Sequence, residues 1–479
     1  MNGIPAHAER MPAGGSAAAP ASLAQLIQRA TGDNVFRCYH CVKCTSGCPL
    51  ADQFDLTPTQ VIRSLQLDDA RVFESRAIWL CASCYICTTR CPVDIDVASV
   101  MRALCIEGKR RGVRPAIPDI DRFNSVFALV VKWFGRIHEL TLVALFNLAR
   151  RRPLGDWRTG FEMLRRGRLR LIPRRVRPPK QVSRIDGPDG SGQQVAYFPG
   201  CSASSHAVEY DRTARASAGA LGIELVEPPN WTCCGSCHVE ASAPELADLL
   251  PMRTVTSVER MGVDTVTSPC SECFIRLRSS EQRAARDPQL AAEIELQTGY
   301  AYRGEVQVQH LLSVIMERAG IQKIRDRVKN PLQDLKVACY YGCLMTRPPK
   351  VTEAAHPEYP MAMDELLCAL GAEPVAWSSK TECCGNSLCL TQPSIGEGMM
   401  RRILEDARDC RAEAIVAMCP LCHTNLDVRQ AQLGLGYRRP ILYATQLMTL
   451  AFGLGAKAAL LNKHSVDPRP LLEKKNLLD

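Results

Sequence analysis

The sequence predicts an α/β protein in which an N-terminal α-helical module precedes two pseudo-symmetric Rossmann-like α/β units. Two cysteine runs with the same spacing lie near the N-terminus, and a long internal repeat follows them. Each copy of the repeat alternates short apolar runs with amphipathic helical segments. The chain has 479 residues, 46% hydrophobic and 23% charged, which suits a globular protein of about three domains.

Cysteine is the unusual residue, with 24 in the chain. Because the first 22 residues lack the apolar segment of a secretory signal, we expect a cytoplasmic protein, where disulfides are rare. Many cysteines in such a compartment indicate metal ligation or redox chemistry. The most apolar stretch, residues 127–148, is interrupted by Lys132, Arg136 and Glu139, so it predicts a buried or interface helix rather than a membrane span.

Composition shifts and turn-rich stretches divide the chain into six segments. In order, we expect a disordered tail with a short helix, a helical cysteine-rich module, a helical basic linker, two repeat units and a C-terminal tail. Their boundaries are 1–35, 36–112, 113–194, 195–328, 329–455 and 456–479.

The net charge of +9 is concentrated in residues 150–180, which hold twelve Lys or Arg and two acidic residues. One interpretation is a solvated linker. The alternatives are docking to an anionic membrane surface, in a peripheral position on its inner face, or to an acidic partner. Nucleic-acid binding is not expected, because neither interleaved aromatic residues nor a DNA-binding motif accompanies the charge.

Each N-terminal run has the pattern C-x2-C-x2-C-x3-C-P of bacterial ferredoxins. In this pattern three cysteines of one tight turn bind one [4Fe–4S] cube, and the cysteine before the proline binds the other cube. The first cubane cluster is therefore assigned to Cys38, Cys41, Cys44 and Cys91, and the second to Cys81, Cys84, Cys87 and Cys48. A zinc site is the structural alternative, but two complete runs with prolines favour the dicluster. Helical patterning at residues 57–67 indicates an α-helical ferredoxin module.

The repeat pairs a single cysteine, a Cys-Cys-Gly and a Cys-x-x-Cys in each copy. In the first copy these are Cys201, Cys233, Cys234, Cys270 and Cys273, and in the second Cys343, Cys383, Cys384, Cys419 and Cys422. We expect strands at residues 195–198, 222–226, 263–267, 337–340, 375–377 and 414–418, with helices at 216–221 and 246–261. Parallel sheets gather ligands at the carboxyl ends of their strands. Cys201, Cys270, Cys343 and Cys419 each follow an expected strand.

This order of cysteines resembles the cysteine-rich CCG domain, and with the helical dicluster module the chain resembles heterodisulfide reductase. Residues 36–180 are similar to its C subunit and residues 195–452 to its B subunit, including the stretches 337–343 and 419–423. The resemblance implies that each set of five cysteines holds a noncubane [4Fe–4S] cluster. It also implies an enzyme that cleaves or forms a disulfide or persulfide at these clusters, with electrons relayed by the two cubane clusters.

The resemblance further implies a flavoprotein electron-transfer partner of the A-subunit type, or else a membrane cytochrome. No dinucleotide fingerprint or Walker A sequence is present. The iron–sulfur subunits of glycolate oxidase and anaerobic glycerol-3-phosphate dehydrogenase share this module order. A pure electron-transfer subunit that passes electrons toward quinone is therefore the second hypothesis, and a zinc-stapled scaffold is the third.

Six cysteines remain outside these sets. We expect Cys105 and Cys368 in the core, Cys339 in a strand, and Cys237 and Cys389 near the cluster sites, while Cys410 has no assigned role. His206, His238 and His423 flank the cysteines. They are either hydrogen-bonding residues of the fold or proton donors to a thiolate product.

Overall fold

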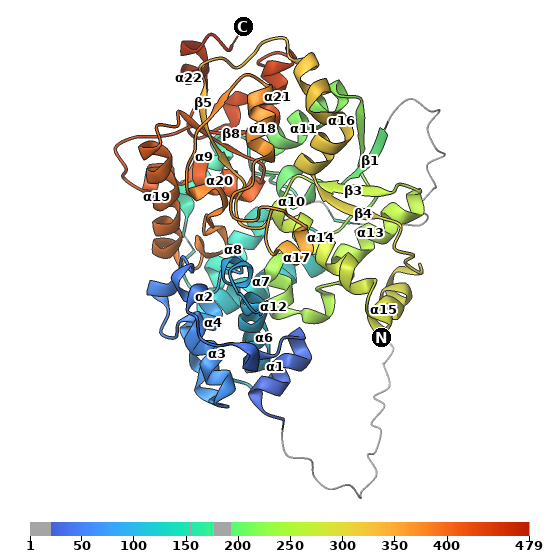
Figure 1. The fold of residues 1–479 in the computed structure, drawn as a ribbon, viewed down its shortest axis with the longest axis vertical. Helices are drawn as coiled ribbons and strands as arrows, with labels where there is room; N and C mark the ends of the chain where they lie inside the picture. The colour runs from blue at the N-terminus through green and yellow to red at the C-terminus, as the bar shows by residue number, and fades with distance from the viewer. Residues whose placement is uncertain (1–20, 154, 174, 177–192, 479) are drawn as a thin grey trace, which may run out of the picture.

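The computed structural model describes residues 21–153, 155–173, 175–176 and 193–478. It comprises a helical N-terminal part, a helical linker, and two α/β units that lie side by side (Figure 1). The expected tail at residues 1–20 and most of the expected turn-rich stretch at 181–194 lie outside the described residues. Within the described residues, no helix has the length and apolar character required to cross a membrane.

The dicluster region is entirely helical, as predicted. Its α-helices are α1 (Leu23–Thr31), α2 (Lys43–Ser46), α3 (Pro58–Gln66), α4 (Arg76–Leu80), α5 (Ile86–Thr89) and α6 (Val97–Arg110). α3 begins with a proline after a capping box between Thr57 and Gln60, and the Asp96 side chain caps α6. Both cysteine runs fold alike, because α2 and α5 each follow a left-handed residue, Val42 and Tyr85.

The linker segment, residues 113–194, forms three α-helices where the sequence predicts helix. They are α7 (Pro118–Phe134), α8 (Glu139–Ala149) and α9 (Trp157–Arg165). α7 packs against α12 (Ser236–Ser242) of the first repeat unit, and α9 packs against α20 (Pro420–Val428) of the second. The linker segment therefore contacts both α/β units.

Each repeat unit contains one parallel four-stranded sheet, and the two sheets have the same strand order, β2-β1-β3-β4 and β6-β5-β7-β8. The strands are β1 (Gln193–Tyr197), β2 (Ile223–Val226), β3 (Thr265–Ser268), β4 (Gln307–His310), β5 (Lys336–Tyr340), β6 (Glu373–Pro374), β7 (Ala414–Ala417) and β8 (Ile441–Tyr443). This arrangement confirms the predicted pair of Rossmann-like units.

Three strands differ from the sequence prediction. β6 ends before the expected residues 375–377, because the chain turns and Trp377 donates its indole N–H to the carbonyl of Cys339. β4 and β8 were not predicted. β4 has the sequence QVQH, whose polar residues lack the apolar pattern of a buried strand. β8 is only three residues long.

The α-helices of the two units cover both faces of the sheets. In the first unit they are α10 (Gly200–Ala203), α11 (Val208–Ala220), α12, α13 (Leu249–Met261), α14 (Ser271–Ala284), α15 (Pro288–Thr298) and α16 (Leu311–Arg327). In the second unit they are α17 (Pro349–Thr352), α18 (Ala362–Ala369), α19 (Pro393–Asp409), α20 and α21 (Ala444–Ala451), followed by α22 (Arg469–Lys474).

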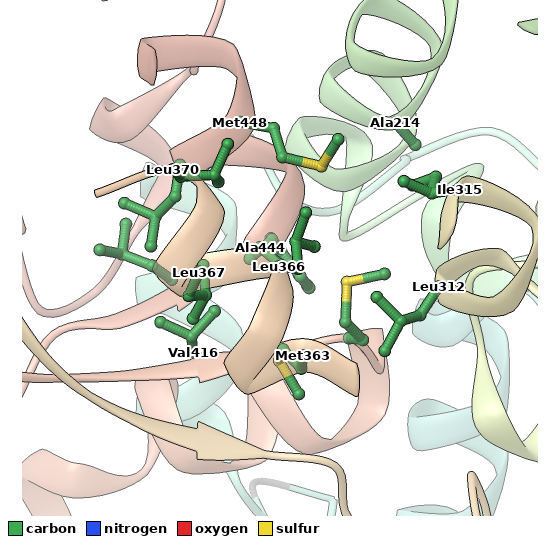
Figure 2. Close-up of a cluster of buried hydrophobic side chains, with 14 of the residues drawn as sticks. Ala214, Leu312, Ile315, Met363, Leu366, Leu367, Leu370, Val416, Ala444 and Met448 are labelled. Atoms are coloured by element: carbon green, nitrogen blue, oxygen red, sulfur yellow. The ribbon is translucent and has the colours of Figure 1, made fainter. Parts of the chain in front are cut away.

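One hydrophobic core joins the two units. Figure 2 shows Leu312 and Ile315 of the first unit near Met363 and Leu366 of the second. α11 packs on α21 and α16 packs on α18, so each unit covers the other with helices. A fully buried Leu or Ile side chain contributes roughly 1.5–3 kcal/mol. The interface is therefore a continuation of the core, and the two units hold a fixed relative position.

Candidate functional site

The structure brings the cysteines of the dicluster region together in two groups. Cys38 lies within electrostatic range of Cys41, Cys44 and Cys91, and burial, followed by the charges of these neighbours, raises the pKa of its thiol. Backbone N–H groups of residues 40 and 95 donate to the sulfurs of Cys38 and Cys91, at 3.4 and 3.3 Å. Cys91, which precedes the proline of the second run, thus lies with the cysteines of the first run.

The second group is more deeply buried. Burial raises the pKa of the Cys87 thiol well above its usual range, and the charges of Cys81, Cys84 and Cys48 raise it further. Burial also raises the pKa of Cys48 to about 12, with smaller contributions from neighbouring thiols that include Cys383 of the second repeat unit. The second group therefore adjoins the second repeat unit.

In each repeat unit, the loops and helix starts that follow the strands bring its five cysteines together. In the first unit the Cys233 thiol hydrogen-bonds with Cys201 and Cys234, which together with burial raises its pKa well above the usual range. Cys234 in turn hydrogen-bonds with Cys273. In the second unit Cys383 contacts Cys343, and Cys384 and Cys422 have their sulfurs 3.7 Å apart.

A glycine before the first cysteine makes room for the last one in each unit. Gly200 has φ +68°, and a Cβ there would lie 2.8 Å from the sulfur of Cys273. Gly342 has φ +70°, and a Cβ there would lie 3.1 Å from the sulfur of Cys422. Any side chain would thus be strained and would crowd the cysteine sulfur.

The two cysteine sets meet at the boundary between the units. The thiols of Cys270 and Cys419 hydrogen-bond with each other, and this contact holds the pKa of Cys419 well below its usual range. Each residue immediately precedes the helix that follows its unit's third strand, α14 or α20. Cys270 and Cys419, which occupy equivalent positions in the two repeat units, therefore face each other.

All ten repeat-unit cysteines line one cavity of about 360 Å³. Cys237 and Cys389 line it as well, as expected from their positions after the Cys-Cys-Gly sequences. The linker segment supplies an apolar wall, which consists of Ile137, Leu140, Leu142, Val143, Met163 and Leu169. The cavity is thus bounded by both repeat units and the linker.

The linker also supplies an acidic group that the sequence did not reveal. Glu139 accepts hydrogen bonds from His206 Nδ1 at 3.0 Å and from the Ser205 hydroxyl. Burial raises the pKa of Glu139, but the contacts with His206 outweigh burial and hold it below its ordinary value. The N–H of Ile137 donates to the Cys201 sulfur at 3.3 Å. Linker residues therefore contact the first cysteine set directly.

The other two histidines have different surroundings. His238 lines the cavity and hydrogen-bonds with Asn124 at 2.7 Å, and burial lowers its pKa to about 4. His423 is fully buried, stacks on Tyr443 and hydrogen-bonds with the carbonyl of Ile441. His423 thus has a structural role, whereas His206 and His238 face the cavity.

The remaining cysteines fit the sequence expectations with one exception. Cys105 is buried and Cys339 is buried within β5, as expected. Cys368 was expected in the core but is exposed, because it lies on the outer side of α18.

One arginine of the basic segment is completely buried between the repeat units. Arg168 forms ion pairs with Glu209 of α11 at 2.7 Å and with Asp427 of α20 at 3.0 Å. Its Nε donates to the carbonyl of His206 at 3.2 Å. The interpretation of the basic segment as a solvated linker is therefore wrong at Arg168, since local charge patterning does not show which arginine pairs with two buried carboxylates.

The donor set suits iron–sulfur clusters. Thiolate is the ligand that such clusters use. Backbone N–H groups of Gly235 and Gly385 donate hydrogen bonds to the sulfurs of Cys233 and Cys383. Within the described residues, no three His, Cys, Asp or Glu side chains form a site for a single metal ion. A cluster, by contrast, distributes its cysteine ligands over several iron atoms.

Comparison with known families and proteins agrees with this chemistry. The cysteine-rich CCG domain family matches residues 195–278 and 337–427, and the 4Fe-4S dicluster domain family matches residues 34–95. The chain is 31% identical over 284 residues to the 8-methylmenaquinol:fumarate reductase membrane anchor subunit of Wolinella succinogenes, which covers 58% of this chain and 99% of that protein.

Two heterodisulfide reductase subunits match different parts of the chain. The B subunit of the ferredoxin/F(420)H(2)-dependent CoB-CoM heterodisulfide reductase of Methanosarcina acetivorans is 28% identical over 291 residues, covering 59% of this chain and 96% of that protein. The C subunit of the ferredoxin:CoB-CoM heterodisulfide reductase of Methanosarcina mazei is 34% identical over 90 residues, covering 19% of this chain and 56% of that protein.

Proposed function

Because the chain belongs to the family of CCG iron–sulfur proteins that includes the B subunit of heterodisulfide reductase, fused here to a dicluster domain like that of the C subunit, we propose that it cleaves or forms a disulfide or persulfide. The observation that carries this proposal is the shared cavity. All ten repeat-unit cysteines line it, and Cys270 of the first unit meets Cys419 of the second. A disulfide placed there has one set of five cysteines beside each sulfur.

The two cubane clusters are proposed to use the ligands assigned from the sequence, and each repeat unit to hold a noncubane cluster on its five cysteines. Bound clusters would supply electrons one at a time to the two sides of the cavity. The contacts between neighbouring cysteines support a path for electrons. The path would run from the cysteines of the first cubane cluster to those of the second, then through Cys383 to the second repeat unit and through Cys419 to the first.

The reaction in the reducing direction is R–S–S–R′ + 2 e⁻ + 2 H⁺ → RSH + R′SH. One S–S bond breaks, two electrons arrive from a reduced partner, and two protons are taken up. His206 faces the cavity and its Nδ1 is fixed by Glu139 at 3.0 Å, so it is placed to deliver one of these protons through Nε2. The linker side of the cavity is apolar, which disfavours water beside the reacting sulfurs.

The electrons require a partner, because the sequence shows no nucleotide-binding motif. Related proteins are subunits of larger reductases, as their names state. We propose a flavoprotein subunit as donor, with a membrane cytochrome as the alternative. We further propose a peripheral position at the membrane, which the exposed apolar side chains of the linker support.

A second candidate function is electron exchange with a quinol or quinone. Two observations favour it: the apolar wall of the cavity, and the relative named as an 8-methylmenaquinol:fumarate reductase subunit. In this case the cavity would accept a lipophilic ring rather than a disulfide. Both candidates use the same cysteine sets, so they differ in the ligand that enters the cavity.

The decisive experiment is anaerobic purification followed by iron analysis and EPR spectroscopy after oxidation, with and without added thiols. Four [4Fe–4S] clusters correspond to ~16 iron per chain. A full complement with a paramagnetic signal that depends on thiol supports disulfide chemistry. About eight iron, or a signal that responds to a quinone analogue and to no thiol, contradicts it. The Cys384→Ser variant removes one predicted ligand of the second unit, and Cys410→Ser is the matched control.

A further inference from the structure

Arg347 is the one buried arginine or lysine in the described part of the chain that has no carboxylate partner. The residue is only 1% exposed. The other buried arginines and the buried lysine each form an ion pair; they are Arg168, Arg276, Arg429 and Lys380. Burial of a charge costs free energy unless an opposite charge compensates it, so Arg347 requires a counter-charge from another source.

The hydrogen bonds of Arg347 do not supply that charge. Its Nε donates to the carbonyl of Cys343 at 3.4 Å, and its Nη2 donates to the carbonyl of Thr381. Both acceptors are neutral main-chain groups. They fix the position of the guanidinium, but they leave its positive charge uncompensated.

The guanidinium lies where the dicluster region meets the second repeat unit. Burial and the charge of Cys383 raise the pKa of the Cys84 thiol, whereas the charge of Arg347 acts in the opposite direction. Cys84 is a predicted ligand of the second cubane cluster, and Cys343 and Cys383 are predicted ligands of the second unit. Cysteines bind metal as thiolates, so Arg347 lies near two sets of groups that become negative when iron is bound.

Another arginine near the second cubane cysteines already has a counter-charge. The charge of Arg102 opposes the rise in the pKa of Cys81 that burial causes, and Arg102 forms an ion pair of 2.6 Å with Glu240. Asp96 adds negative charge near Cys81. Arg347, in contrast to Arg102, keeps its full charge available to these thiolates.

The repeat indicates that the fold does not require an arginine at this position. Four residues after the first cysteine of each unit, the second unit has Arg347 and the first unit has Ser205. The Ser205 hydroxyl donates to the Glu139 carboxylate and to the carbonyl of Cys201. The loop after the first strand therefore forms without a guanidinium in the first unit. The charge is specific to the unit whose cysteines adjoin the second cubane group.

We propose that Arg347 is the counter-charge of the second cubane cluster and raises its reduction potential. This inference rests on the proposed function, from which it takes the ligands of that cluster. Net charge is one of the factors that set the potential of an iron–sulfur cluster. Arg347 stays protonated, so it compensates an electron from the reduced flavoprotein partner without proton uptake. No bond forms or breaks in this one-electron step.

Redox titration of the cluster-loaded full chain, followed by EPR spectroscopy, tests this role. Arg347→Gln removes the charge but keeps an amide that can donate to a carbonyl. We expect it to lower the equilibrium constant for one-electron reduction of the second cubane cluster at least tenfold, which corresponds to about 59 mV. Arg347→Lys keeps the charge and should restore most of the potential. The signal that changes in Cys84→Ser identifies the cluster, and Arg408→Gln, an exposed arginine of the same unit, is the matched control.

Equal potentials in Arg347→Gln and the wild-type chain overturn the proposal. An equal decrease in Arg347→Gln and Arg347→Lys, or in Arg408→Gln, also overturns it, because the charge at this position would then be irrelevant. If Arg347→Gln loses iron, Arg347→Lys decides the question. Full iron and the wild-type potential in Arg347→Lys support the counter-charge, whereas loss of iron or a lowered potential overturns it.

Turnover of a disulfide with reduced methyl viologen separates this result from the proposed reaction. A lowered potential in Arg347→Gln, with no turnover by any chain, leaves the counter-charge intact and contradicts the reaction. Turnover by the wild-type chain, with an unchanged potential in Arg347→Gln, supports the reaction and overturns the counter-charge.

Discussion

Arg102, on the last helix of the dicluster region, forms an ion pair of 2.6 Å with Glu240 of the first repeat unit. Arg276 of the same unit reaches the same carboxylate oxygen at 2.8 Å. Burial raises the pKa of Glu240, but the two arginines outweigh burial and bring it to about 2. This carboxylate therefore joins the dicluster region to the first repeat unit.

The lowered pKa of Glu240 predicts the direction of a pH effect. Its stabilisation is fully present above the ordinary glutamate pKa of 4.5 and is lost as the pH falls from there toward 2. At pH 7, Glu240→Gln should therefore lower the free energy of unfolding by roughly 3 kcal/mol. Anaerobic urea unfolding at pH 7 and pH 4.5 measures both values, and the difference between variant and wild type should be smaller at pH 4.5. Glu245→Gln, an exposed carboxylate, is the control; a penalty that grows toward acid would contradict the assignment.

Removal of Arg168 should destabilise the contact between the two repeat units. Arg168→Met leaves the buried carboxylates of Glu209 and Asp427 without a counter-charge, which costs about 3–5 kcal/mol. Urea unfolding of the cluster-loaded chain measures the loss, and Arg165→Met, an exposed arginine of α9, should change it by less than about 0.5 kcal/mol. Additional replacement of the two carboxylates by their amides should recover part of the loss. Equal effects of the Arg168 and Arg165 substitutions would show that the ion pairs of Arg168 with Glu209 and Asp427 do not stabilise the chain.

The glycine before the first cysteine of each unit should be irreplaceable. In Gly342→Ala the new Cβ would lie against the Cys422 sulfur, so we expect the second unit to lose its cluster, or about four iron per chain. Iron analysis and far-ultraviolet circular dichroism of the purified variant measure cluster loss and folding separately. Gly304→Ala is the matched control, because Gly304 also has positive φ (+81°) but no neighbour within 4 Å of the added Cβ. Full iron content in Gly342→Ala would show that the sulfur tolerates the contact.

The exposed surface of the linker should bind anionic membranes. Trp157, Phe161 and Leu164 of α9 are exposed together with the following Leu171 and Ile172, Trp157 to 59% and Ile172 to 81%. Exposed arginines accompany these apolar side chains: Arg151, Arg152, Arg158, Arg165 and Arg175. An apolar face with aromatic residues and a basic margin is typical of helices that lie in the membrane interface.

Vesicle co-sedimentation tests this surface. The chain should bind phosphatidylglycerol vesicles, bind phosphatidylcholine vesicles at least tenfold more weakly, and detach in part at high salt. The double variant Trp157→Ser/Phe161→Ser should reduce binding about tenfold without loss of iron, and Leu296→Ser, on the distant α15, serves as the control. Equal binding by the double variant and the wild type would assign this surface to a protein partner instead.

The sequence was sufficient for the iron–sulfur domains and the repeat, because the cysteines and the turn glycines occupy fixed spacings along the chain. It also predicted β1, β3, β5 and β7, whose apolar runs are buried in the centre of each sheet. It did not predict β4, since the polar residues of QVQH are accommodated by contacts that only the folded chain brings together.

The same limit applies to the cavity. Glu139 and Arg168 carry no motif, and each acquires its role from partners more than 30 residues away. In the basic segment, periodicity predicted the helices but not which side of α9 faces the cavity. Thr159, Gly160 and Met163 face it, whereas Trp157 and Phe161 face outward.

The linker that crosses both repeat units also determines how the assembly is made. Proteins similar to the two halves of this chain are named as separate B and C subunits. Here the peptide chain fixes their ratio at one to one and replaces a bimolecular encounter with a permanent effective concentration. Dilution therefore leaves the dicluster region and the cavity of each molecule together.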